Sequence, residues 1–216
     1  MVLQLQPSPP PLAAPTSPPG PHLPLYGLDI ETDTSVDGLD PAVSPVVAVA
    51  IATPDRDHVL LGDESSILTR TDQLLASLPP GVVVTWNGAG FDLPFLAHRA
   101  GVVGVELGLE LWQEPLMAFE PEAFRGRWHH HDHLDGYRLY RADVGRGLGL
   151  PCGLKPLARL VGLAPVEVER DRLHLLHQDQ VRDYVASDAR MARQLVLRRW
   201  PVAARAADSC HRPVPD

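Results

Sequence analysis

The stretch LYGLDIETDT, residues 25–34, begins as a buried strand and yet carries two carboxylates. Its apolar residues, such as Leu28 and Ile30, are typical of a core strand. Because a strand places residues i and i+2 on the same face, Asp29 and Glu31 point the same way. Short acidic pairs also occur at solvated strand ends, so this pair acquires meaning only from the rest of the chain.

The 216-residue chain is predicted to hold one folded domain over residues 25–203. Residues 1–24 contain nine prolines and no charged residue, a composition that predicts an extended or disordered tail. Residues 204–216 are predicted to be a short C-terminal tail. A secretory signal and a membrane-spanning run are not expected, and two cysteines are too few for a disulfide framework, so we expect a soluble, cytoplasmic protein.

The net charge of −8 argues weakly against nucleic acid as a partner, but the charge is unevenly distributed. Residues 25–124 carry 16 acidic and 3 basic residues, whereas residues 125–216 carry 11 acidic and 16 basic residues. The basic residues of the middle of the chain either follow the phosphates of a single strand or belong to exposed helix faces. They are Arg125, Arg127, Arg138, Arg141, Arg146, Lys155 and Arg159.

Hydrophobic periodicity predicts an α/β domain in which strands come first and helices dominate later. The expected strands cover residues 25–32, 46–53, 58–61 and 81–86, and the expected helices cover residues 65–78, 92–100, 134–143, 154–161 and 177–200. Within the stretch 104–133, residues 112–128 are predicted to be a long loop with scattered apolar anchors.

Two further acidic residues stand at informative places. Asp92, in VTWNGAGFDLPFL (84–96), follows a strand and a glycine-rich turn, and ligand sites of open α/β sheets form at such strand ends. A helix N-cap would equally explain Asp92. In the helix predicted over 177–200, Tyr184 and Asp188 lie one turn apart on the apolar stripe, so Asp188 should face the core. A buried carboxylate needs a counter-charge.

The three acidic segments together resemble the Exo I, Exo II and Exo III motifs of the DEDD-type (DnaQ-like) 3′–5′ exonucleases. LDIET (28–32) is similar to the first motif, WNGAGFDLPFLAHRA (86–100) to the second, and YVASDA (184–189) to the tyrosine variant of the third. The second segment is most similar to the exonuclease domain of B-family DNA polymerases. The resemblance implies a ribonuclease-H-like fold, with a mixed sheet of five or six strands flanked by helices.

The resemblance also implies a two-metal hydrolase with Mg²⁺ or Mn²⁺, hard cations that prefer oxygen ligands. Asp29 would bridge both ions, Glu31 and Asp188 would complete the site of the ion that activates water, and Asp92 would serve the second ion. Tyr184 would orient the attacking water rather than act as a base, since an unperturbed phenol has a pKa of about 10.

The expected activity is release of nucleoside 5′-monophosphates from the 3′ end of single-stranded nucleic acid, with DNA favoured over RNA. Leu28, Asn87 and Phe91 are candidates for the slot of the terminal nucleotide, with packing or turn formation as the alternative. No polymerase segment follows, so a free-standing nuclease is expected, or one that acts in trans with a polymerase or repair partner. An RNA exonuclease is the near alternative. A non-catalytic binding module of the same fold and a scaffold role for the Pro-rich tail are less favoured.

The run HHHDH, residues 129–133, invites a zinc hypothesis. Neighbouring side chains in one loop diverge, and the sequence has no cysteine or second histidine pair at zinc-finger spacing. We therefore predict a solvated or strand-edge segment here and leave it out of the site.

Overall fold

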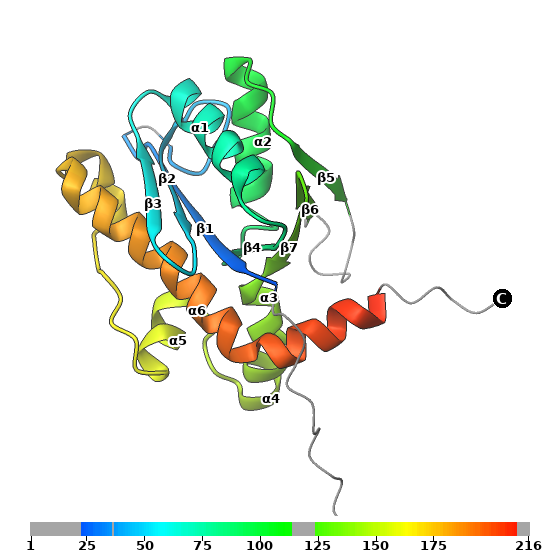
Figure 1. The fold of residues 1–216 in the computed structure, drawn as a ribbon. Coiled ribbons are helices and arrows are strands. Elements are labelled where there is room, and N and C mark those ends of the chain that lie inside the picture. The colour runs from blue at the N-terminus through cyan, green and yellow to red at the C-terminus, as the bar shows by residue number, and fades with distance from the viewer. Residues whose placement is uncertain (1–22, 36, 114–123, 211–216) are drawn as a thin grey trace, which may run out of the picture.

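The computed structural model describes residues 23–35, 37–113 and 124–210, and its centre is a mixed seven-stranded sheet (Figure 1). The strand order is β3-β2-β1-β4-β7-β6-β5. β1 pairs in parallel with β4, and β4 with β7, whereas the other neighbours are antiparallel. The strands are β1 (Leu25–Thr32), β2 (Val46–Ala52), β3 (Asp57–Leu61), β4 (Val82–Thr85), β5 (Leu109–Gln113), β6 (Phe124–Trp128) and β7 (His131–Asp135).

Helices cover both faces of the sheet, as the sequence predicts for an α/β domain (Figure 1). The helical elements are α1 (Glu64–Ser77), α2 (Asp92–Val103), α3 (Gly136–Tyr140), η1 (Arg141–Gly145), α4 (Arg146–Leu148), α5 (Leu154–Leu160), η2 (Arg170–Leu175) and α6 (Gln178–Cys210). The helix predicted over 177–200 continues to residue 210, beyond the predicted domain boundary at 203. Within the described part of the chain, none of the helices combines the length and the apolar character needed to cross a membrane.

The two faces of the sheet differ in the size of their side chains. On one face, large apolar residues such as Leu28, Val49 and Ile51 pack with α1 and α2 in the main core. On the other face, Ala48, Ala50 and Ala52 of β2 pack with Val181, Val185 and Ala189 of α6. Since strand residues alternate in facing, the pattern AVAIA of β2 produces this asymmetry. The small residues allow α6 to lie close to the sheet.

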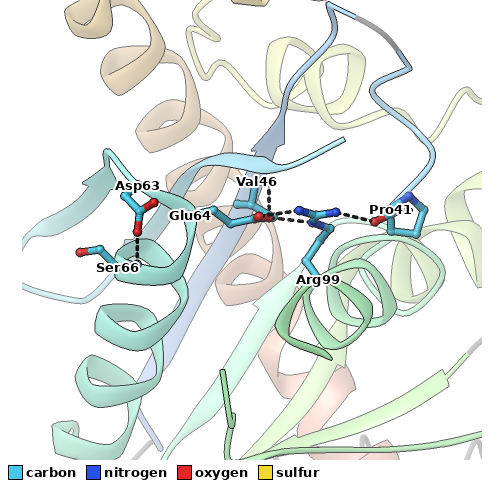
Figure 2. Close-up of polar contacts among 6 residues, drawn as sticks. All are labelled: Pro41, Val46, Asp63, Glu64, Ser66 and Arg99. Carbon is cyan, nitrogen blue, oxygen red and sulfur yellow. Dashed lines mark hydrogen bonds and ion pairs between the residues drawn. The ribbon is translucent and has the colours of Figure 1, made fainter. Parts of the chain in front are cut away.

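A buried ion pair fixes the helices of the large-residue face to each other (Figure 2). Arg99 of α2 donates to both carboxylate oxygens of Glu64 of α1, at 2.8 and 2.6 Å, and to the carbonyl of Pro41 at 3.0 Å. Glu64 also accepts from the amide of Val46 at the start of β2, at 2.7 Å. Hydrogen bonding to Glu64 raises the pKa of Arg99, so the guanidinium stays charged in this site.

The sheet has more strands than predicted, because the end of β5 and all of β6 lie within residues 112–128, which were predicted to be a loop, and β7 follows from His131. In β6, the residues at 124, 126 and 128 alternate with exposed Arg125 and Arg127, the period of a half-buried strand. The central part of the predicted loop, residues 114–123, lies outside the described residues, as do residues 1–22 of the predicted tail.

The histidine-rich run is also placed differently from the prediction. β7 lies between β4 and β6, so His131 and His133 are inside the sheet, whereas His129 and the exposed His130 form the turn between β6 and β7. The imidazole of His131 is 0% exposed, with Nε2 2.7 Å from the carbonyl of Leu75 near the end of α1. His130 Nε2 lies 2.7 Å from the carbonyl of Leu78. These two histidines therefore lie within hydrogen-bond distance of carbonyls at the C-terminal end of α1. The last carbonyls of a helix have no partner within the helix.

Candidate metal centre and cleft

Three parallel strands end at the same edge of the sheet, and the predicted acidic residues gather there. β1 carries Asp29 and Glu31 near its carboxyl end. β4 ends at Thr85 and leads through a turn to Asp92 at the start of α2. The carboxyl ends of neighbouring parallel strands are the usual place of ligand sites in open α/β sheets.

Gly27 brings α6 to this edge. A Cβ atom at Gly27 would lie 2.0 Å from the carbonyl oxygen of Ala189, so only glycine allows the backbone of α6 to approach β1 so closely. Gly27, Asp29 and Glu31 share one strand face by the period of two. The helix that contacts Gly27 therefore places Asp188, the residue before Ala189, next to the two carboxylates of β1.

Asp29, Glu31 and Asp188 form the candidate metal centre. Each offers a carboxylate oxygen, and these ligand atoms all lie within 4.8 Å of one another. Asp188 is 1% exposed, whereas Asp29 and Glu31 are partly exposed toward the cleft. Carboxylates at this separation repel each other, so the arrangement is favourable only with positive charge close by. An oxygen-only donor set of this kind suits Mg²⁺ or Mn²⁺.

Asp92 of α2 and Tyr184 of α6 are the other two residues predicted for the site. Asp92 is the first residue of α2, while Phe91 is its N-cap residue and makes no side-chain cap hydrogen bond. Asp92 is therefore not the N-cap residue of α2, and it borders the cleft. Tyr184 is buried on α6, one turn before Asp188, and also borders the cleft.

The turn between β4 and α2 is held by Asp135, at the end of β7. The Asp135 carboxylate accepts from the amides of Asn87 at 2.9 Å and Ala89 at 3.1 Å, and it caps α3 by accepting from the amide of Tyr137 at 3.0 Å. Burial raises the pKa of Asp135, although the hydrogen bonds from Asn87 and Ala89 act in the opposite direction. Asn87 itself has a φ of 68°, a left-handed conformation that asparagine tolerates better than most residues.

Asp29, Glu31 and Asp92 border one large cleft of about 1240 Å³. Pockets for small ligands usually measure roughly 300–1,000 Å³, so this cleft is large enough for part of a polymer. Its lining combines carboxylates, aromatic rings and one ammonium group. The lining residues used below are Asp29, Glu31, Trp86, Asn87, Phe91, Asp92, Tyr137, Lys155 and Tyr184.

Leu28 is the predicted site residue that the structure places elsewhere. Its side chain is 1% exposed and packs in the main core with α1 and α2. The period of two explains this, because Leu28 points to the opposite face from its neighbour Asp29. Sequence reasoning also missed Trp86 and Tyr137 as cleft residues, and it gave Lys155 no place beside Asp188. The contacts of Lys155 depend on α6, so no local pattern could have identified them.

Fold and site together define an α/β protein with a carboxylate-lined cleft at the ends of its parallel strands. The family described as "Predicted 3′-5′ exonuclease related to the exonuclease domain of PolB" matches residues 46–189. That match covers more than half of the chain, and the chain belongs to this family. The matched residues include Asp92, Tyr184 and Asp188, while Asp29 and Glu31 lie before the match.

Individual proteins similar to this chain are consistent with membership of this family. The chain is 31% identical over 97 residues to a DNA polymerase of Archaeoglobus fulgidus, covering 44% of this chain and 11% of the polymerase. It is 28% identical over 100 residues to a DNA polymerase of Pyrococcus glycovorans, covering 41% of this chain and 13% of that polymerase. The structure of the family B DNA polymerase from the hyperthermophilic archaeon Pyrobaculum calidifontis matches 84% of this chain and 25% of that protein, with a TM-score of 0.69 and 22% identity. This structural match supports the fold.

Proposed function

We propose that the protein is a metal-dependent 3′–5′ exonuclease of the tyrosine DEDD subgroup, acting on single-stranded nucleic acid and releasing nucleoside 5′-monophosphates. The observation that carries the proposal is the convergence of Asp29, Glu31 and Asp188 within 4.8 Å beside a large open cleft. Asp92 and Tyr184 border the same cleft, which supports assigning them to the same site.

The residues present fit a divalent cation, because all the ligand atoms are carboxylate oxygens. Bound divalent cations would supply stabilisation of the negative phosphate oxygens and increase the acidity of a nearby water molecule. Asp29, Glu31 and Asp188 would hold them, with Asp92 as a further ligand. In the proposed reaction the oxygen of water bonds to phosphorus, and the bond from phosphorus to the 3′ oxygen of the preceding nucleotide breaks. That oxygen takes up a proton, so the shortened strand ends in a 3′-hydroxyl.

The other cleft residues have roles that follow from their chemistry. The hydroxyl of Tyr184, one helical turn from Asp188, would orient the attacking water by a hydrogen bond. The rings of Phe91, Trp86 and Tyr137 border the cleft and would stack on bases without reading their sequence. Asn87 offers amide and carbonyl groups to the same space.

DNA is the favoured substrate because both relatives named above are DNA polymerases. Discrimination against RNA would depend on contacts to the 2′-hydroxyl, so RNA is the alternative outcome of the test. Action in trans with a polymerase or repair partner stays a prediction.

The test uses purified protein, Mn²⁺ and matched single strands of DNA and RNA labelled at the 5′ end. We expect a ladder of products shortened from the 3′ end, release of nucleoside 5′-monophosphates, and faster degradation of DNA. Asp29→Asn, purified in parallel, controls for host nucleases and should be inactive. Internal cleavage of a circular strand, or equal activity of Asp29→Asn and the wild type, would contradict the proposal.

A further inference from the structure

Lys155 is the only lysine of the chain, and it lies against the acidic centre. It stands in the first turn of α5, its side chain is 14% exposed, and it borders the cleft. Its Nζ lies 3.5 Å from Asp188 Oδ2 and 4.0 Å from the centre of the Tyr184 ring. One ammonium group thus contacts two residues that lie one turn apart on α6.

Both contacts are favourable in this environment. The ammonium balances the charge of a carboxylate that is almost fully buried, where an uncompensated charge would be costly. It also lies over the ring of Tyr184 at a distance typical of a cation–π interaction. Together they restrict the positions of the Asp188 carboxylate and the Tyr184 ring.

Lysine differs from arginine in a way that matters here. Its compact charge sits on a flexible stem of four carbons, whereas the planar fork of arginine binds carboxylates bidentately. Lys155 is the one lysine among the 19 lysine and arginine residues of this protein. The ammonium can therefore leave Asp188 by rotation of its own side chain, without movement of α5.

We propose that Lys155 is a positioning residue that acts as the internal counter-cation of the metal-free site and competes with the divalent cation for Asp188. This inference rests on the proposed metal-dependent function. Metal binding then displaces the Lys155 ammonium from Asp188 Oδ2. The affinity of the protein for metal is consequently lower than the carboxylates alone would give. In the absence of metal, the ammonium holds the Asp188 carboxylate and the Tyr184 ring in place.

Calorimetric titration with Mn²⁺ alone, on the full chain, tests this without any assay of activity. Lys155→Met removes the charge but keeps much of the stem, and we expect it to bind Mn²⁺ at least about fivefold more tightly, which corresponds to about 1 kcal/mol. Its thermal unfolding without metal should occur at a lower temperature than that of the wild type. Lys155→Arg keeps the charge on a side chain that can bind a carboxylate bidentately, so it should bind Mn²⁺ no more tightly than the wild type does. Arg159→Met, on the same helix but paired with Glu167, should leave the affinity unchanged.

The possible results separate this inference from the proposed function. If Lys155→Met binds Mn²⁺ with the affinity of the wild type or more weakly, the lysine is only a structural support and the inference is wrong, while the metal site stands. If Lys155→Met does not fold, Lys155→Gln is measured against the same criterion. If neither the wild type nor any lysine variant binds Mn²⁺, the metal site and the inference both fall.

Discussion

Asp29 of β1 and Asp188 of α6 present carboxylate oxygens within 4.8 Å of each other, although they stand at opposite ends of the folded chain. Gly27 makes this possible, because its missing side chain lets the backbone of α6 approach β1 beside the two carboxylates. The position of the candidate metal centre is therefore set by backbone packing.

Gly27→Ala should disturb the packing and the site together. The added methyl would lie 2.0 Å from the carbonyl oxygen of Ala189, so α6 must shift outward. We expect a loss of about 1–3 kcal/mol in the free energy of unfolding, the usual cost of overpacking, and weaker binding of Mn²⁺. Urea unfolding and calorimetric titration measure the two effects. Gly101→Ala is a matched control, since its added methyl meets nothing within 4 Å and alanine favours a helix. A Gly27→Ala protein with wild-type metal affinity would contradict this account.

Asp29→Asn and Asp188→Asn should each abolish turnover while the fold survives. Loss of one ligand removes much of the charge stabilisation of the reaction, and we expect the rate to fall by at least roughly 10³-fold. Asp29→Asn removes a charge from a crowded acidic site and should leave the metal-free protein as stable as the wild type or more stable. Nuclease assays and thermal unfolding check both statements. Asp183→Asn, an exposed aspartate of the same helix, should keep full activity.

Tyr184→Phe should lower the rate of hydrolysis and keep metal binding. The hydroxyl is expected to orient water, so its loss should cost about 10–100-fold in kcat, as for partners that orient reacting groups. The phenylalanine ring still packs on α6 and beneath Lys155. Single-turnover kinetics with calorimetric titration of Mn²⁺ would show this separation. Loss of Mn²⁺ binding in Tyr184→Phe would indicate that the hydroxyl holds the site and not the water.

Arg99→Met should destabilise the protein strongly. It leaves the buried carboxylate of Glu64 without its cation, which typically costs about 3–5 kcal/mol. In contrast, Arg159→Met breaks an ion pair whose two side chains are 54% and 55% exposed, and should change the free energy of unfolding by about 0–1 kcal/mol. Urea unfolding of the two variants compares a buried with an exposed pair. Equal losses would argue against the structural importance of the Glu64–Arg99 pair.

Stability should fall as the pH decreases below about 6.5, because the buried His131 and the half-buried His133 resist protonation. Burial lowers the pKa of His133 to about 3 and also lowers that of His131. The unfolded chain takes up protons on these imidazoles near pH 6.5 while the folded protein does not, so protons favour unfolding. Urea unfolding at pH 7.5, 6.5 and 5.5, above the range in which most carboxylates titrate, measures the slope. In His133→Gln the slope should be smaller, and an unchanged slope would show that His133 does not contribute.

Local sequence patterns predicted the strands and helices that have a regular apolar period. The apolar runs of β1 and β2 and the stripe of α6 have the periods of strand and helix, and the acidic residues at their ends followed from position and resemblance. β7 was missed because its polar residues His131, His133 and Asp135 are satisfied by partners far away in sequence. Such partners leave no trace in the segment itself.

Two incorrect predictions, the loop at residues 124–128 and the cleft position of Leu28, could have been avoided from the sequence. The alternation in FRGRW is that of a half-buried strand, and it was outweighed by the polar, proline-containing neighbourhood. The facing of Leu28 follows from the same rule that pairs Asp29 with Glu31, so its place in the core was predictable. The contact of Lys155 with Asp188 was not predictable, because α5 and α6 meet only in the folded protein.

The most direct measurement is anomalous X-ray diffraction at the manganese edge from crystals soaked with Mn²⁺ and a nucleoside 5′-monophosphate. The proposed function predicts a manganese peak bounded by the carboxylates of Asp29, Glu31 and Asp188, with the phosphate of the nucleotide beside it in the cleft. Manganese bound elsewhere, or nucleotide seated in the cleft while the three carboxylates hold no ion, would contradict it.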